Sequence, residues 1–173
     1  MLARFLFMEM EGKRMGFINC NLNVLMAERG LNIQRIKENT TLSRTTISYL
    51  VNNYGGGIHY ETLKQLCHLL RCQPGDIFTY YDFDVSFEVM ERKEENSSLQ
   101  GEAIETALNL QVDIFYNGKL DPLQLMVYFD GNKRKNIIDS EVQLNIARFY
   151  PFAVQKYFYD QLEKFLIKNW ESV

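Results

Sequence analysis

One stretch of the chain, residues 32–53, constrains the fold more than any other because it predicts two short helices joined by a tight turn. Asn32 is a good N-cap for the first helix, which ends near residue 40. Ser43 is placed to cap the second helix, over 43–53, in which Ile47 and Leu50 lie three residues apart and can face a core. The side chains left pointing outward carry polar groups of a size that suits a groove of DNA, and they are Arg44, Thr45, Ser48, Tyr49 and Asn52.

Helical patterns flank this pair on both sides. Residues 21–30 have the spacing of a capped helix that Gly30 terminates. After a glycine-rich loop, Leu63, Leu66 and Leu70 recur at helical spacing over 61–70, and Pro74 marks the start of a short further helix. Five helices therefore fit residues 21–81.

These residues resemble the Cro and lambda-repressor type of helix-turn-helix protein, in particular a small bacterial branch whose domains end in a cysteine, a proline and Gly-Asp. The resemblance covers about residues 17–81 and rests, in chain order, on Gly30, Ile36, Ser43-Arg44-Thr45-Thr46-Ile47-Ser48, Asn52, Thr62-Leu63 and Cys72 through Ile77. Two positions depart from the family pattern, since Lys37 replaces a small residue and Thr41 replaces a glycine in the turn. We expect Lys37 to extend into solvent and Thr41 to adopt a backbone angle that glycine takes more easily.

The resemblance implies a DNA-binding regulator that occupies an operator, and it implies a role for each matching position. Arg44, Thr45 and Tyr49 would face base edges in the major groove, with Thr46 and Asn52 nearer the phosphates. The family often has a glutamine near position 33 for a phosphate contact, which Gln34 or backbone amides would replace here. The expected DNA-binding residues are Gln34, Ser43, Arg44, Thr45, Thr46, Ser48, Tyr49 and Asn52. The structural alternatives are that Tyr49 packs on the domain surface and that Arg44 pairs with Glu38 or with solvent.

Charge divides the chain unequally. Residues 1–81 carry nine Lys and Arg against six Asp and Glu, a net +3, and residues 82–173 carry ten against sixteen, a net −6, which together give the −3 of the chain. A net charge of +3 is small for phosphate binding, so a monomer should bind DNA weakly and with strong salt dependence. A homodimer would double the contacts and read two half-sites about one helical turn apart.

Beyond residue 81 the apolar residues alternate, which predicts strands near 85–89, 110–114 and 123–128. Asn117-Gly118 is a hairpin turn signal, and Asp130-Gly131 marks another reversal before a possible strand over 142–146. The polar segment 94–98 is predicted to be a loop and residues 103–108 a helical turn. From Pro151 onward a broad apolar stripe predicts a helix of about twenty residues that covers the sheet.

The predicted fold class is therefore α+β. An arm at 1–16 precedes an all-α, five-helix, lambda-repressor-like domain over 17–81, and a small antiparallel sheet with a long C-terminal helix follows over 82–173 as a dimerisation or effector domain. The opening residues are apolar but short and interrupted by charge, so neither a signal peptide nor a membrane span is expected.

Neither a cofactor nor a metal is expected. Cys20, Cys67 and Cys72 form no CxxC motif and do not combine with His59 or His68 at a usual zinc spacing. An odd number of cysteines without a secretory signal indicates reduced thiols in the cytoplasm. Residues 82–173 contain no histidine, no cysteine and no phosphate-binding glycine loop, so an enzyme is not expected.

Three functions stay open at this level. The first is a repressor-like regulator of a bacterium, phage or mobile element that binds double-stranded DNA as a homodimer. The second is a phage anti-CRISPR-type protein, in which the acidic C-terminal domain inhibits a CRISPR nuclease by direct binding while the helix-turn-helix autoregulates. The third is a small-molecule sensor, although no polar residues converge in the C-terminal pattern to mark a pocket.

Overall fold

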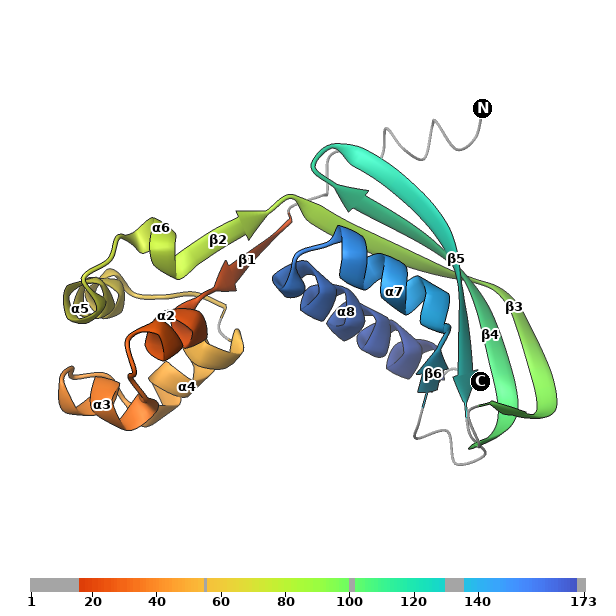
Figure 1. The fold of residues 1–173 in the computed structure, drawn as a ribbon, viewed down its shortest axis with the longest axis horizontal. Coiled ribbons are helices and arrows are strands. Elements are labelled where there is room, and N and C mark those ends of the chain that lie inside the picture. The colour runs from red at the N-terminus through yellow and green to blue at the C-terminus, as the bar shows by residue number, and fades with distance from the viewer. Residues whose placement is uncertain (1–15, 55, 100–101, 130–135, 171–173) are drawn as a thin grey trace. The chain divides into compact units, whose positions relative to one another are not determined.

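A computed structural model describes residues 16–170 apart from 55, 100–101 and 130–135 (Figure 1). The chain divides into two compact units, of which one spans Phe17–Tyr81 and the other includes everything from Asp82 onward. Helices and antiparallel sheets are both present, so the α+β class is confirmed. The predicted N-terminal arm lies, up to residue 15, outside the described residues.

The first unit is built mainly of short helices around a shared core. They are α2 (Leu22–Glu28), α3 (Ile33–Glu38), α4 (Arg44–Asn52), α5 (Tyr60–Leu70) and α6 (Pro74–Ile77). Each contributes one side chain with 0% exposure to the centre of the unit, namely Leu22, Ile36, Ile47, Leu66 and Ile77 in chain order. Burying one such side chain stabilises a fold by about 1.5–3 kcal/mol relative to leaving it exposed, so the apolar spacing of the sequence explains why these helices pack together.

The predicted helix ends are confirmed where they matter for the helix pair. Asn32 caps α3, because its Oδ1 accepts a hydrogen bond from the Arg35 backbone N–H at 2.9 Å. Ser43 caps α4 in the same way through the Thr46 N–H, at 3.0 Å. Gly30, just beyond α2, has a φ of +61°, a left-handed backbone that glycine adopts without strain.

The expectation of an all-α domain is wrong, because the two ends of this unit form a small sheet. Strands β1 (Phe17–Cys20) and β2 (Phe78–Tyr81) pair antiparallel with Phe17 opposite Tyr81, and these two rings stack at 5.2 Å between centroids. Both segments are rich in aromatic and β-branched residues, which suit a strand. Only the meeting of two segments far apart in the sequence supplies the backbone hydrogen bonds, so the local pattern did not reveal the sheet.

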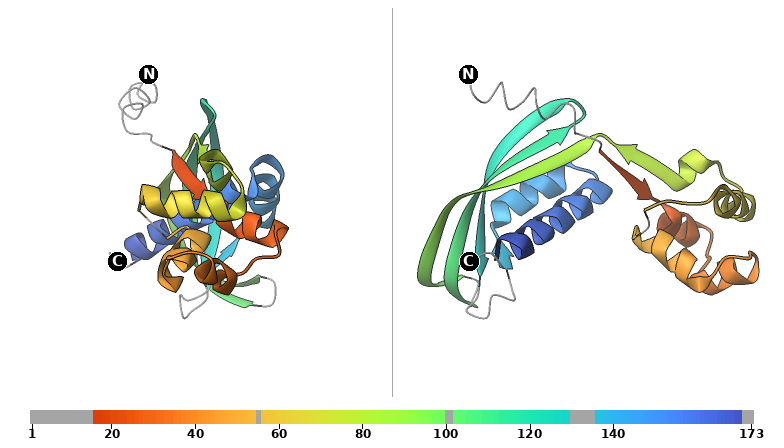
Figure 2. Two further views of the ribbon diagram at one scale, coloured as in Figure 1. Left: turned by 90° about the vertical axis from the view of Figure 1, so that its left-hand side faces the viewer. Right: turned by 180° about the vertical axis from the view of Figure 1, so that it is seen from behind.

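The second unit is a four-stranded antiparallel sheet in the order β3-β4-β5-β6. Its strands are β3 (Phe83–Leu99), β4 (Glu102–Tyr116), β5 (Lys119–Phe129) and β6 (Asn136–Ile138). Helices α7 (Ser140–Phe149) and α8 (Phe152–Trp170) lie side by side on one face of this sheet, as Figure 1 and the right-hand view of Figure 2 show. The side chains of α8 that face the sheet are buried and recur every four residues, at Val154, Phe158, Leu162 and Leu166.

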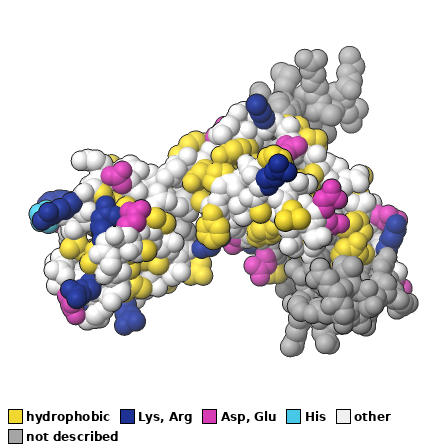
Figure 3. Space-filling model, in the orientation of Figure 1, with side chains coloured by type: hydrophobic (Ala, Val, Ile, Leu, Met, Phe, Trp, Pro, Cys, Tyr) yellow, Lys and Arg dark blue, Asp and Glu magenta, His cyan; other side chains and the backbone are white. Residues whose placement is uncertain are grey.

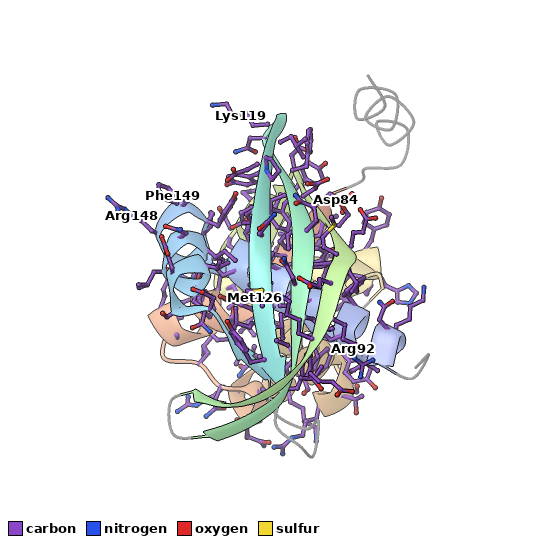
Figure 4. The ribbon with its side chains drawn as sticks, turned by 90° about the vertical axis from the view of Figure 1, so that its right-hand side faces the viewer. Asp84, Arg92, Lys119, Met126, Arg148 and Phe149 are labelled. Atoms are coloured by element: carbon purple, nitrogen blue, oxygen red, sulfur yellow. The ribbon has the colours of Figure 1, made fainter. Side chains whose placement is uncertain are left out.

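The hairpin predicted at Asn117-Gly118 is confirmed between β4 and β5. Both residues have a positive φ, 50° for Asn117 and 75° for Gly118, as a two-residue turn with the twist of its strands requires. Figure 4 shows Lys119 at this end of the sheet, and the view looks onto the face of the sheet opposite the two helices.

Two local predictions in the hairpin formed by β3 and β4 are wrong. The predicted loop at 94–98 belongs to β3 and the predicted helical turn at 103–108 belongs to β4, where Glu94 lies opposite Thr106 and Ser97 opposite Ile104. Cross-strand pairing overrides the weak helical preference of the second segment.

The possible strand at 142–146 is also wrong, because these residues lie in α7. The Asp139 carboxylate accepts a hydrogen bond from the Glu141 N–H at 2.7 Å and so starts a helix. Val142 and Ile146 are four residues apart, which suits one helix face as well as it suits a strand. The reversal predicted at Asp130-Gly131 lies outside the described residues.

Candidate nucleic-acid interface

The candidate interface is the outward side of α4, the second helix of the predicted pair. Exposed side chains on α4 are Arg44, Thr45, Tyr49 and Asn52, and Ser48 is half-buried between them. Residues four apart on a helix lie on the same face, so positions 44, 48 and 52 align beside positions 45 and 49. The structure therefore brings five of the predicted DNA-binding residues onto one side of one helix, opposite the buried Ile47 and Leu50.

Two further predicted residues, Ser43 and Thr46, are engaged in the helix cap. Their hydroxyl oxygens lie 2.8 Å apart, and the Ser43 hydroxyl also accepts the Thr46 N–H. These contacts hold the first turn of α4, whose N-terminal end carries the positive pole of the helix dipole next to Arg44. Their first role in the structure is thus to shape the start of the helix.

Gln34 lies on α3 and is not part of the side of α4. Its Nε2 donates to Glu38 Oε1 at 2.8 Å along the same helix. Glu38 forms no ion pair with Arg44 in the described part of the chain, so the predicted alternative of an Arg44–Glu38 pair is wrong. Arg44 is exposed, which leaves the other alternative, contact with solvent alone, open. Lys37 is exposed, as expected for a long side chain that must reach solvent.

Tyr49 occupies the boundary between this helix side and a neighbouring cleft. Its side chain is 54% exposed, and it lines a cleft of about 310 Å3 together with residues of β1, β2 and the loop after α4. Most of the lining is apolar, including Ile18, Leu50 and Ile58. Tyr49 therefore has an apolar support on one side and solvent on the other.

The C-terminal end of α4 is anchored by Asn53, which is not among the predicted site residues. Asn53 has a φ of 61°, and its side chain accepts from the Cys20 N–H at 2.5 Å and donates to the Cys20 carbonyl at 3.2 Å. Asparagine is among the few residues with a side chain that adopt this backbone readily at a helix end. That preference is the sequence signal that could have identified it.

The turn before α4 is anchored by Gln65 of α5, which was also missed. Gln65 bonds both the backbone and the side chain of Thr41 across 24 positions of sequence. The expectation of a glycine-like angle at Thr41 is wrong, since the described non-glycine residues with positive φ are Asn53, Arg71 and Asn117. No local pattern could have identified Gln65, because its partner is distant in the sequence.

The unit is only mildly basic. Residues 17–81 carry six Lys and Arg against four Asp and Glu, and Figure 3 shows both kinds of side chain spread over the visible face of this unit. Arg35 and Lys37 of α3 and Arg44 of α4 are exposed. The attraction to phosphates is therefore modest for one copy of the unit.

The cysteines of this unit behave as packing residues. Burial raises the pKa of the Cys20 and Cys72 thiols above the usual value, which keeps them protonated near neutral pH. Within the described ranges, no three His, Cys, Asp or Glu side chains gather as a metal ion would need. In the same ranges, no helix has the length and apolar content needed to cross a membrane.

Comparison with known proteins bears on the first unit. Residues 21–82 match the family model of the Cro/C1-type HTH DNA-binding domain. The chain is also 33% identical over 79 residues to an uncharacterized HTH-type transcriptional regulator, YozG, of Bacillus subtilis strain 168, a match that covers 92% of that protein and 45% of this chain. No solved structure matches the chain.

Proposed function

The chain belongs, through residues 21–82, to the Cro/C1-type helix-turn-helix family, and on that premise we propose that it is a sequence-specific transcriptional repressor that occupies an operator. The observation that carries the proposal is the outward side of α4, where polar side chains align on a helix whose two ends are anchored to other parts of the unit. Because both ends of α4 are anchored, its outward side chains keep a fixed orientation toward the base pairs of the DNA.

In the proposed complex α4 lies in the major groove, which is about 12 Å wide and admits a helix. Arg44, at the exposed start of α4, bonds the two acceptors of a guanine. Thr45 and Tyr49, one helical turn apart, bond a base edge or contact a thymine methyl group. Ser48 and Asn52 line the same side, and Asn52 keeps its carbonyl oxygen as an acceptor while its amide nitrogen donates to the Ser48 carbonyl at 2.8 Å.

Gln34, Ser43 and Thr46 are proposed to lie toward the phosphates. The start of α4 favours anions because its backbone N–H groups point outward there. Contacts of this kind fix the position of the helix on the duplex and carry no sequence information themselves. Sequence preference therefore depends chiefly on Arg44, Thr45 and Tyr49.

The proposed active form is a homodimer held by the second unit. Large apolar side chains are exposed on its helices, with Leu144 69%, Phe149 65% and Phe152 78% exposed. Figure 4 shows Phe149 and Arg148 at the end of α7, where the Arg148 guanidinium lies 5.6 Å from the centre of the Phe149 ring. Large apolar side chains that are exposed can mark protein contacts, and a second copy would compensate for the small charge of one reading unit.

The experiment is in-vitro selection of DNA sites by the full-length protein, followed by affinity measurements at fixed salt. An inverted repeat should be enriched, because two copies related by a two-fold axis read two half-sites. Arg44→Ala should weaken binding to the selected site by about 1–3 kcal/mol, or roughly 5- to 150-fold.

Arg71→Gly is the matched control for that variant. It removes the same charge from the exposed end of α5, and glycine tolerates the φ of 51° at this position. If Arg44→Ala and Arg71→Gly weaken binding equally, α4 is not the reading helix. Enrichment of a single half-site would refute the proposed homodimer but would not contradict the proposal that α4 reads the DNA sequence.

A further inference from the structure

The turn between α3 and α4 is tied to α5 by Gln65, and we propose that Gln65 is a positioning residue for DNA recognition. By holding Thr41, it sets the angle at which α4 leaves the turn and meets the duplex. The inference rests on the proposed function, since positioning matters only if α4 reads DNA.

The contact has two points of attachment. The Thr41 backbone N–H donates to Gln65 Oε1 at 2.8 Å, and Gln65 Nε2 lies 2.9 Å from Thr41 Oγ1 as a donor. The Thr41 hydroxyl is also within 3.1 Å of Gln65 Oε1. Two bonds to one residue fix both the distance and the orientation of the turn relative to α5.

Gln65 is itself held firmly. It is half-buried on α5 and directly precedes Leu66, which is fully buried in the core of the unit. Leu63 and Cys67 pack against the same core on either side of it. The side chain therefore projects from a packed helix rather than from a loop, which lowers the entropy lost when it holds its partner.

The other polar contacts of the turn stay close in the sequence. The Asn39 N–H donates to the Ile36 carbonyl at 3.2 Å, and the Leu42 N–H donates to Thr40 Oγ1 at 3.3 Å. The Thr40 hydroxyl donates in turn to the Ile36 carbonyl at 2.7 Å. These bonds shape the turn as an extension of α3. The bond between Thr41 and Gln65 instead fixes the position of the turn relative to α5.

Loss of this contact should affect specific and non-specific binding differently. Base readout needs several side chains of α4 to reach their partners at once, so a small change in helix angle weakens it. Binding to phosphates depends mainly on charge and tolerates such a change. A positioning role therefore predicts a lower ratio of specific to non-specific affinity, with the non-specific affinity retained.

The test compares full-length wild type, Gln65→Ala and His68→Ala by fluorescence anisotropy, on the selected duplex and on a scrambled duplex of equal length. Gln65→Ala should lower the affinity ratio about three- to tenfold, the effect of losing one or two net hydrogen bonds that position the helix. His68→Ala changes another polar residue of α5 that is exposed, and it should leave the ratio unchanged.

A double-mutant cycle with Thr41→Val separates the contact from general damage to the unit. Thr41→Val removes the hydroxyl and keeps the backbone N–H, so alone it should lower the ratio less than Gln65→Ala. Added to Gln65→Ala it should have no further effect, because both changes break the same contact. Full additivity of the two changes would overturn the proposal. If Gln65→Ala does not fold, the Thr41→Val variant alone tests the proposal. An unchanged ratio of specific to non-specific affinity in Thr41→Val would then overturn it.

Amide exchange of Thr41, followed by NMR without DNA, tests the contact independently. In Gln65→Ala the Thr41 N–H should exchange faster while amides in α5 stay protected, and unchanged exchange would overturn the proposal. A wild type that binds the selected and scrambled duplexes equally would instead overturn the proposed function, and this inference with it. A wild type that discriminates, together with a Gln65→Ala variant that discriminates equally well, would overturn the positioning role alone.

Discussion

Asn53 provides the sharpest prediction about stability, because one side chain performs two separable tasks at the end of α4. Its backbone is left-handed, with a φ of 61°, and its amide group bonds both the N–H and the carbonyl of Cys20 in β1. Substitutions at this single position can remove the two contributions in turn. Asn53→Ala removes both, Asn53→Gly removes only the side-chain bonds, and Asn53→Asp keeps the acceptor for the Cys20 N–H.

The magnitudes follow from these geometries. A left-handed backbone costs a residue such as alanine roughly 1–2 kcal/mol. Taking the acceptor from a largely buried N–H costs roughly 1–3 kcal/mol. We therefore expect Asn53→Ala to lower the free energy of unfolding of the first unit by about 2–5 kcal/mol and Asn53→Gly by about 1–3. Asn53→Asp loses the bond to the Cys20 carbonyl and places a carboxylate oxygen near it, so we expect a loss of about 1–2 kcal/mol.

Hydrogen exchange measured by mass spectrometry on the full-length protein is the suitable assay, because it follows peptides of the first unit separately from those of the second. A loss of 2 kcal/mol or more corresponds to an exchange rate roughly thirtyfold faster or greater. Peptides covering β1 and α4 should show the effect most clearly, because Asn53 joins these two elements.

Asn52→Ala is the control, since Asn52 is the adjacent residue and is exposed, and among the residues that the structure describes its side chain bonds only to Ser48 of its own helix. It should change stability by less than about 0.5 kcal/mol. The argument would be refuted if Asn53→Ala exchanged no faster than Asn52→Ala. An equal effect of the alanine and glycine variants would refute the backbone contribution alone.

Two further predictions concern the second unit. Phe158 of α8 is buried, and its ring centre lies 5.7 Å from that of Phe87 in β3, so Phe158→Ala should destabilise this unit by roughly 3–5 kcal/mol in urea unfolding followed by circular dichroism. The exposed Lys156→Ala on the same helix should have little effect, and similar midpoints for the two variants would contradict the prediction. Burial, together with Asp121, whose carboxylate accepts from the Tyr150 hydroxyl at 3.3 Å, raises the pKa of Tyr150 from 10.0 to about 12. Because the folded pKa lies above the unfolded one, the associated stability is present below pH 10 and is lost between about pH 10 and 12. Tyr150→Phe should remove one late step, near pH 12, from the tyrosinate absorbance titration and weaken this loss of stability. If the step that disappears instead lies near pH 10, Tyr150 ionises normally and the prediction is wrong.

Part of the second unit was predictable, and part was not, for a common reason. The turn at Asn117-Gly118 and the long helix α8 follow from signals within a few residues, namely left-handed turn residues and apolar side chains four apart. The paired segments around Glu94 and Thr106 carry no such signal, and they become strand only because they meet each other. Position 144 illustrates the remaining ambiguity, since Leu144 alternates with Val142 as in a strand yet lies exposed on a helix.

For the first unit, the sequence by itself determined the helices α3 and α4, their caps at Asn32 and Ser43, and the set of side chains that line the outward side of α4. Caps and helical spacing act within about four residues, so one stretch of sequence contains the whole signal. Only the tertiary structure decided how α4 is held, through Gln65 at the turn before it and Asn53 at its end. Those contacts join residues 24 and 33 positions apart, and their hydrogen bonds exist only once the core has brought the elements together.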